Sequence, residues 1–269
     1  MTVHAAPTPP ERTLERTVDP SRRPAVSAAD LPARSIDELR LAEDAAAGGC
    51  PICNARERAT ERRITALLAE GVNDLGTRAR LERGRGFCAT HTTRVVETDR
   101  RRSGGTLGAA ILLAAVLRQR LDELAGLPAN RGRGSNRRLA AAAQPPDCQI
   151  CEHARQAEGL ATASLVGLAG LPAWSVVLCV SSFCLDHLVG SASVAARSPR
   201  EIQDRWQIVA AAQLDRLALV SETLEGFVAN SSFERRSQMT ADQLEATTEA
   251  AAALASSAAG CGRAGRIAR

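Results

Sequence analysis

Two sets of cysteine and histidine residues are the part of the chain best suited to chemistry. Each set joins a Cys-x-x-Cys to a later Phe-Cys-x-x-His, and the ligand candidates are Cys50, Cys53, Cys88 and His91, then Cys148, Cys151, Cys184 and His187. In the first set 34 residues lie between Cys53 and Cys88, and in the second set 32 lie between Cys151 and Cys184. This spacing indicates one module used twice, and thiolates with imidazole in groups of four are the donors that hold structural zinc.

The donor count favours a structural role for the metal. Three cysteines and one histidine fill all four positions of a tetrahedral zinc ion, so no position remains for a substrate. The sequence therefore predicts two zinc ions and argues against a catalytic metal. An iron–sulfur cluster usually takes four cysteines, which makes it a weaker fit, and copper or another soft metal stays open.

Two other interpretations of the cysteines compete with a metal site. Cysteine is often buried simply as a small apolar residue. A thiol redox pair is the second, although the βαβ pattern that accompanies such a motif in thioredoxin-like proteins is missing from the sequence. A redox or metal-handling protein is therefore kept as an alternative function.

The sequence leaves open how the ligands combine. Either pairing, within a repeat or across the repeats, provides two sets of three cysteines and one histidine. We expect pairing within each repeat, because closing the shorter loop costs less conformational entropy.

The elements that position these motifs are predicted to be helical throughout. No window alternates with period two over a convincing length, so the fold class is all-α, with two tandem, pseudo-symmetric modules each stapled by a Cys₃His site. The predicted regions are a disordered leader (1–34), a first module (35–127), a flexible Arg/Pro/Gly linker (128–147), a second module (148–229) and a C-terminal helix with a tail (230–269).

Several helix starts and one apolar stretch are specific enough to predict. Ser35 with Glu38 forms a capping box, Pro51 suits a first helical turn, and Thr240 caps a last helix. The stretch from Gly159 to Leu185 has no charged residue and is long enough for a bilayer. We interpret it as a buried helical hairpin, since a span would separate Cys151 from Cys184, which within-repeat pairing places on one metal.

Composition adds limits rather than a function. Aromatic residues make up 2% of the chain, with no tyrosine, so the cores must be built from aliphatic side chains. All basic residues are arginines, and the net charge of +4 is weak support for a nucleic-acid partner. The N-terminus lacks the apolar segment of a secretory signal, which leads us to expect a cytoplasmic protein with no membrane contact.

Some candidate residues lie outside the two sets. We expect Cys179 to be in the core, Cys261 to be a free thiol in the tail and His153 to be a surface residue or to contact a ligand; His4 has no assigned role. A basic cluster in the linker is compatible with phosphate contacts, yet no aromatic residues are interleaved with it to stack bases. The cluster consists of Arg131, Arg133, Arg137 and Arg138.

The motif order resembles a family of uncharacterised bacterial proteins that is defined only as a domain of unknown function. The resemblance covers about residues 36–255 and rests on the eight ligand candidates and on Gly86–Phe87 before Cys88. Ser182 stands where the family pattern has glycine before Phe183. The resemblance implies a helical, cytoplasmic protein without a defined activity. The leading hypothesis is a zinc-binding scaffold that acts on an unknown protein partner, and a nucleic-acid-associated regulator is a further alternative.

Overall fold

A computed structural model describes residues 31–125, 140, 142–231 and 240–254 of the chain. Within these ranges every regular element is helical, which confirms the all-α prediction. Most of the predicted leader and linker lies outside the described residues. So do the four linker arginines, His4 and Cys261.

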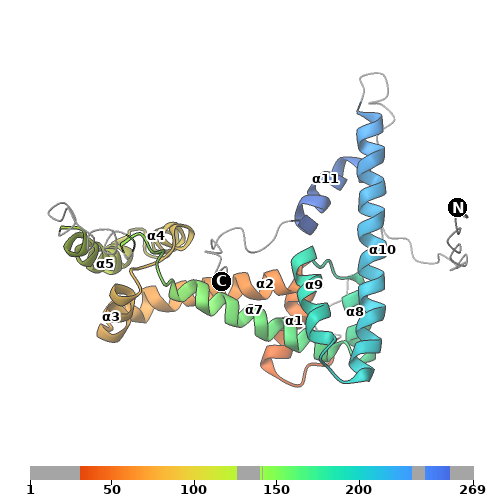
Figure 1. Ribbon diagram of the computed structural model, residues 1–269, viewed down its shortest axis with the longest axis horizontal. Helices are drawn as coiled ribbons and strands as arrows, with labels where there is room; N and C mark the ends of the chain where they lie inside the picture. Colours follow the sequence, from red (N-terminus) through yellow and green to blue (C-terminus); the bar gives the residue numbers. More distant parts are fainter. Residues whose placement is uncertain (1–30, 126–139, 141, 232–239, 255–269) are drawn as a thin grey trace, which may run out of the picture.

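The described chain forms ten α-helices and one π-helical segment, shown in Figure 1. In chain order they are α1 (Ile36–Ala46), α2 (Pro51–Ala66), η2 (Leu67–Gly71), α3 (Leu75–Arg83), α4 (Ala89–Ser103), α5 (Leu107–Ala125), α7 (Gln149–Leu168), α8 (Pro172–Val180), α9 (Leu185–Ala195), α10 (Arg200–Asn230) and α11 (Ala241–Leu254).

The helices α2 and α7 pack side by side in the middle of the molecule (Figure 1). They are antiparallel, because Arg56 of α2 pairs with Glu158 of α7 while Arg63 hydrogen-bonds Gln149. Each helix follows a Cys-x-x-Cys motif. The antiparallel packing therefore carries the two motifs to opposite ends of the pair.

The molecule has two hydrophobic cores, one at each end of the α2–α7 pair. The first surrounds the start of α2 and the end of α7 and includes residues of α1, α8, α9 and α10. It contains Trp174 and an edge-to-face contact between Phe183 and Trp206, whose ring centroids are 5.7 Å apart. The second surrounds the end of α2 and the start of α7, with α3, α4 and α5 around it. Each core thus combines helices from both predicted modules.

Helix starts follow the local signals in the sequence. The Ser35 hydroxyl accepts a hydrogen bond from the backbone N–H of Glu38, and the Glu38 carboxylate accepts one from the N–H of Arg34. At α11, Thr240 and Gln243 form the reciprocal pair of bonds typical of a capping box. These bonds satisfy N–H groups that have no partner inside the helix.

The uncharged stretch Gly159–Leu185 is the second half of α7 followed by α8. A turn at Ala169–Leu171 separates the two helices, and both contribute buried side chains to the first core. Among the described helices, none is both long and apolar enough to cross a bilayer. The stretch is therefore two helices joined by a turn and not one continuous span.

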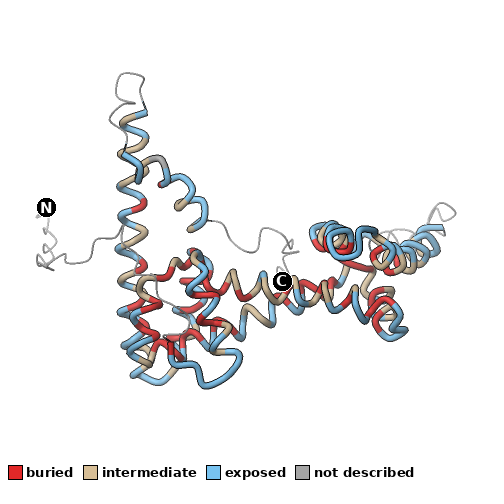
Figure 2. The backbone as a smooth tube through the Cα atoms, turned by 180° about the vertical axis from the view of Figure 1, so that it is seen from behind, coloured by how far each residue is buried: buried red, intermediate tan, exposed pale blue. Residues whose placement is uncertain are grey.

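One helix extends well beyond the rest. The first half of α10 packs on α8 and α9, whereas its second half projects from the body and packs on α11 (Figure 1). Figure 2 shows that this second half carries mainly exposed and partly exposed residues. The whole of α10 has 31 residues, which correspond to about 46 Å at about 1.5 Å per residue. We call the second half of α10 together with α11 the arm.

Candidate metal centres

The same local arrangement presents ligands at four helix starts. Cys50, Cys88, Cys148 and Cys184 are the N-cap residues of α2, α4, α7 and α9, each with extended backbone angles. None of these side chains makes the usual capping bond. The second ligand of each motif follows three residues later, in the first helical turn, where its side chain lies beside the first.

The first cluster consists of Cys50, Cys53, Cys184 and His187. Their ligand atoms all lie within 4.8 Å of one another. The Nδ1 atom of His187 is 3.1 Å from Sγ of Cys184, 3.2 Å from Sγ of Cys53 and 3.3 Å from Sγ of Cys50. The cluster lies in the first core, and only Cys53 among the four is partly exposed.

The second cluster consists of Cys88, His91, Cys148 and Cys151, again with all ligand atoms within 4.8 Å. The Nδ1 atom of His91 is 3.2 Å from Sγ of Cys88, 3.3 Å from Sγ of Cys151 and 3.5 Å from Sγ of Cys148. This cluster lies in the second core, where Cys148 and Cys151 pack with aliphatic residues.

The pairing of motifs differs from our expectation. Each cluster takes its Cys-x-x-Cys from one repeat and its Cys-x-x-His from the other, so the prediction of within-repeat pairing is wrong. The membrane argument built on that pairing also fails, because Cys151 and Cys184 belong to different clusters. The antiparallel packing of α2 on α7 is the cause, since it places the start of each helix beside the opposite Cys-x-x-His.

The interatomic distances fit a tetrahedral ion. Zinc–sulfur bonds of about 2.3 Å give sulfur–sulfur edges of about 3.8 Å in a tetrahedron, and sulfur–nitrogen edges are slightly shorter. The Sγ atoms of Cys53 and Cys184 are 3.8 Å apart, and those of Cys88 and Cys151 are 3.6 Å apart. These separations are far longer than a disulfide bond of about 2.05 Å. The described cysteines are indeed all free thiols. Both clusters therefore offer a closed shell of three sulfur atoms and one nitrogen atom.

A carboxylate orients the histidine of the first cluster. Oε1 of Glu158, on α7, lies 3.3 Å from Nε2 of His187, the ring nitrogen that faces away from the sulfur atoms. The other carboxylate oxygen pairs with Arg56 on α2 at 3.3 Å. A carboxylate on the second nitrogen of a ligating histidine fixes the ring and increases the basicity of the ligand.

The second cluster lacks this carboxylate. Within the described ranges, all hydrogen bonds of His91 involve Nδ1. Thr60 occupies the position in the first repeat that corresponds to Glu158, seven residues after the second cysteine, and its hydroxyl donates to the backbone oxygen of Arg56. On this side of the molecule, carboxylates of α2 instead pair with an arginine of α4, through Glu57 and Glu61 to Arg94.

Without a metal, the first cluster holds separated charges. Burial opposes a charge on His187, but hydrogen bonds with Cys184, Cys50 and Glu158 outweigh it and raise the pKa of His187 to about 11. Hydrogen bonds with Cys184 and Cys53 lower the pKa of Cys50 far below its usual value, whereas hydrogen bonds with Cys184 and Cys50 raise the pKa of Cys53. A thiolate therefore faces an imidazolium, and a metal ion has to displace that proton.

In the second cluster the resolved change concerns Cys148. Burial raises the pKa of this thiol, while hydrogen bonds from His91 and from the backbone at Cys88 lower it by more, so the pKa lies below its usual value. The start of a helix also favours a thiolate, because the helix dipole is positive there.

Different contacts hold the two loops that lead to the Cys-x-x-His motifs. The loop before Cys184 is held by Gln213 of α10, a fully buried residue whose amide donates to the backbone oxygens of Leu178 and Ser181 and accepts from the N–H of Phe183. These bonds satisfy backbone groups at the end of α8. The loop geometry thus depends on a side chain from a distant helix.

The loop before Cys88 depends on two glycines. Gly86 has a φ of +90°, and a Cβ atom there would lie 2.9 Å from Cγ1 of Val116. At Gly84 an added Cβ would lie 2.7 Å from the backbone oxygen of Asp147, whose N–H donates to the oxygen of Gly84. This contact joins the loop before Cys88 to the segment before Cys148. Ser182, which replaces glycine in the second repeat, does not need a positive φ.

The other candidates lie outside both clusters. Cys179 is partly buried and packs against the first core, as predicted, and burial raises its pKa. His153 is exposed and belongs to neither cluster. Sequence reasoning missed Glu158 and Gln213. Glu158 lies two helical turns after Cys151, but it contacts the other cluster, so only knowledge of the pairing across repeats reveals its role.

Comparisons with known proteins identify a family but no activity. No curated protein and no solved structure matches the chain. The profile of a family of unknown function, DUF6062, matches residues 35–251, a range that includes all eight ligand candidates. On the length of this match, the chain belongs to the family DUF6062.

Proposed function

We propose that this protein is a helical scaffold that binds two zinc ions and acts through contact with another protein. The observation that supports it most strongly is the closure of two shells with three sulfur atoms and one nitrogen atom, each near the dimensions of a tetrahedral ion. Zinc prefers this donor set and geometry, whereas iron–sulfur clusters usually take four cysteines.

The proposed ions hold structure and leave no room for a reaction. All four positions of each ion would be occupied by protein atoms, and most ligands are buried. Because each cluster joins two repeats, each ion would crosslink the halves of the chain at one end of the α2–α7 pair. Loss of either ion then releases one end of the molecule rather than one repeat.

Elemental analysis of the full chain, purified without added metal, tests the zinc assignment. We expect about two zinc ions per chain. We also expect the six ligand cysteines to be protected from alkylation until a chelator removes the metal. Cys179→Ser is the matched control, because it removes a partly buried thiol outside the clusters and should retain both ions. Less than one zinc ion per chain, with the ligand thiols open to alkylation, would overturn the proposal. Iron or copper in its place, or disulfides formed reversibly under peroxide, would instead favour the redox or metal-handling alternative.

The proposed partner is a protein, and the arm is the surface that suits it. Leu214, at the middle of α10 where the arm begins, and Leu219 and Val228 within the arm are exposed. Leu214 and Val228 lie on one face of the helix and Leu219 on another, and exposed apolar side chains that gather on a surface are typical of protein contact sites. We also place the scaffold in the cytoplasm, where free thiols persist, and cell fractionation tests this.

A photo-crosslinker at Val228 tests the partner, with Leu160 on α7 as an equally exposed control position. The partner recovered from Val228 has to bind the purified zinc-loaded chain again, and Leu214→Asp should weaken this binding about tenfold or more. Equal crosslinking from both positions, or no effect of Leu214→Asp, would contradict the role of the arm.

A further inference from the structure

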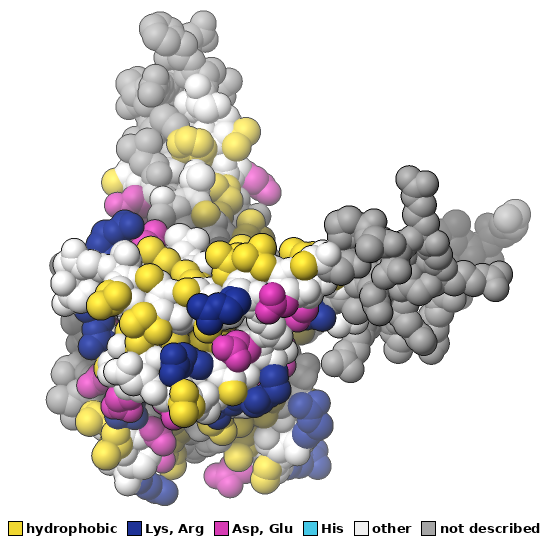
Figure 3. All heavy atoms as spheres, turned by 90° about the vertical axis from the view of Figure 1, so that its left-hand side faces the viewer, with side chains coloured by type: hydrophobic (Ala, Val, Ile, Leu, Met, Phe, Trp, Pro, Cys, Tyr) yellow, Lys and Arg dark blue, Asp and Glu magenta, His cyan; other side chains and the backbone are white. Residues whose placement is uncertain are grey.

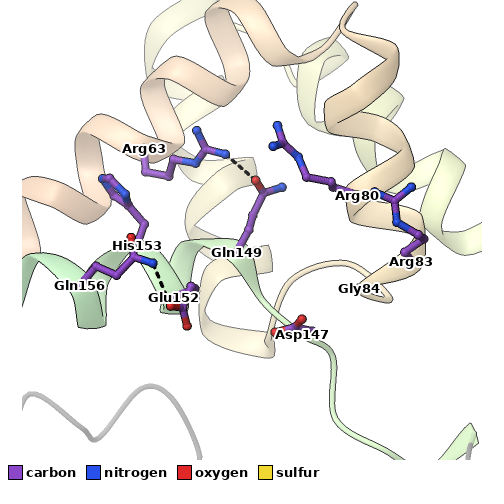
Figure 4. A pocket seen from close by; sticks show the side chains of 9 residues that line it. All are labelled: Arg63, Arg80, Arg83, Gly84, Asp147, Gln149, Glu152, His153 and Gln156. Atoms are coloured by element: carbon purple, nitrogen blue, oxygen red, sulfur yellow. Dashed lines mark hydrogen bonds between the residues drawn. The ribbon is translucent and has the colours of Figure 1, made fainter.

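A pocket beside the second cluster collects arginines from two helices. It has a volume of about 580 Å³ and lies where the end of α2, the end of α3 and the start of α7 meet (Figure 4). Arg63 of α2, Arg80 and Arg83 of α3, and Gln149 and His153 of α7 are among the residues that line it. Figure 3 shows the end of the molecule formed by α3, α4 and α5, where arginines are spread among apolar side chains.

Within the described residues, Arg63, which is partly buried, and Arg80, which is exposed, have no carboxylate partner. In the described part of the chain, the only side-chain hydrogen bonds of Arg63 and Arg80 go to neutral oxygens, on Gln149 at 2.5 Å and on Thr77 at 3.4 Å. Burial, and then the charge of Arg80, lower the pKa of the partly buried Arg63, so the two guanidinium groups repel each other. A bound anion would relieve this repulsion between like charges.

In the described chain, a neutral donor between these arginines has no acceptor. The Gln149 side chain lies between Arg63 and Arg80 in Figure 4, and its oxygen accepts the bond from Arg63. The amide nitrogen of Gln149 is buried, and within the described residues it has no hydrogen-bond partner. Unpaired buried donors are rare in folded proteins, because the lost hydrogen bond to water is not replaced.

The acidic residues of the pocket do not supply the missing acceptors. Glu152 accepts from Gln156 and pairs with Arg155 at 2.7 Å, and Figure 4 shows its carboxylate turned away from Arg63. Asp147 lies at the far edge, beside Gly84. Glu152 and Asp147 thus line the pocket, but within the described residues neither pairs with Arg63 or Arg80.

We propose that this pocket binds a phosphate-type oxyanion carried by a small molecule. A tetrahedral oxyanion offers several acceptor oxygens, which match the guanidinium groups of Arg63 and Arg80, and guanidinium groups pair with phosphate through parallel hydrogen bonds. The volume leaves room for more than the oxyanion itself. Gln149 directly follows the ligand Cys148, so a bound oxyanion would also hold the start of α7 next to the second cluster.

Titration of the full chain with inorganic phosphate, and separately with adenosine monophosphate, tests this proposal by calorimetry. Chloride at equal ionic strength is the reference. Arg63→Gln and Arg80→Gln should each weaken phosphate binding about tenfold or more, because each removes a charged donor. Arg118→Gln, which removes an exposed arginine of α5, should change it less than about twofold. Tighter binding of the ester than of free phosphate would show that the rest of the pocket contacts the ligand.

Three results would overturn the proposal. They are heat no larger than that of chloride, equal weakening by Arg118→Gln, and unchanged binding in both pocket variants. Zinc per chain and helical circular dichroism are measured for every variant, so a variant that loses its fold is recognised. If Arg63→Gln does not fold, Arg63→Lys replaces it, because lysine keeps the charge but not the parallel hydrogen bonds of the guanidinium group. A chain that keeps its metal but ignores phosphate refutes the pocket alone, whereas a chain without metal that binds phosphate refutes the zinc assignment alone.

Discussion

The two clusters share their donors and their local construction but differ in what surrounds them. In the first, Glu158 holds the outer nitrogen of His187 and is itself paired with Arg56. In the second, the described chain provides no such carboxylate, and the loop before Cys88 relies on Gly84 and Gly86 rather than on a buried glutamine. The comparison shows that a repeated ligand motif does not imply repeated support, so we expect the two sites to respond differently to mutation.

The largest expected effect comes from removing ligands, and it tests the pairing itself. Cys53→Ser and Cys184→Ser should abolish the same metal site, and Cys88→Ser should abolish the other, because each cluster combines both repeats. Each variant should fall from about two metal ions per chain to about one. In cadmium-loaded protein, ¹¹³Cd NMR should lose the same resonance in the first two variants. Loss of one shared resonance in Cys53→Ser and Cys88→Ser would instead restore the within-repeat pairing.

The next effect concerns pH at the first cluster. In the metal-free chain His187 has a raised pKa of about 11, so its proton must leave before Nδ1 binds a metal. The apparent zinc affinity of this site should therefore fall as the pH falls, by about tenfold per pH unit for this proton. A raised pKa also stabilises the folded metal-free chain below the unfolded value of about 6.5, and this contribution disappears as the pH rises through 11.

Competition with a chelator between pH 6 and pH 8 measures this dependence, in Cys88→Ser so that only the first cluster binds. Calorimetry in buffers of different ionisation enthalpy counts the protons released. A zinc affinity that does not change with pH would contradict the protonated histidine.

Glu158→Gln should produce a smaller change that is confined to one cluster. The variant keeps the size of the side chain but loses the charge that faces His187, and removal of such a partner typically lowers metal affinity 10- to 100-fold. Thr60→Ala, at the corresponding position of the first repeat, is the matched control and should leave the second cluster within about threefold. Equal losses at both sites in Glu158→Gln would show that the carboxylate acts on overall stability, not on His187.

The smallest expected effect compares the two loops before the Cys-x-x-His motifs. Gly86→Ala should destabilise the chain by about 1–3 kcal/mol, because it forces a side chain into a positive φ and against Val116. Ser182→Gly, at the corresponding position, should change the free energy of unfolding by less than about 1 kcal/mol. Urea denaturation of the zinc-loaded proteins measures both. Similar losses in the two variants would mean that the loops have the same requirements.

The pairing of motifs shows why part of the site was beyond prediction. The loop-closure argument compares small numbers, since each doubling of a loop costs only about 0.6 kcal/mol. Cys53 and His187 are 134 residues apart, about two doublings beyond the separation of Cys53 and Cys88, and the difference is therefore about 1.2 kcal/mol. Burial of a single large apolar side chain contributes about 1.5–3 kcal/mol, so the packing of α2 on α7 easily reverses the preference.

Other predictions succeeded because they rest on local chemistry. The capping boxes at Ser35 and Thr240 depend on residues three positions apart, and the helical class follows from the absence of alternating patterns. Gln213 and Glu158 could not be identified in this way. Their partners lie on other helices, and a buried glutamine or a half-buried glutamate has no distinctive sequence pattern.

The sequence by itself determined the donors, their placement at four helix starts and the helical class, because these depend on residue type and on spacings of three. Only the tertiary structure decided which motifs meet, which histidine receives a carboxylate and where unpaired arginines gather. These features depend on the antiparallel contact between α2 and α7, whose energy is spread over many side chains and leaves no signal at any single position.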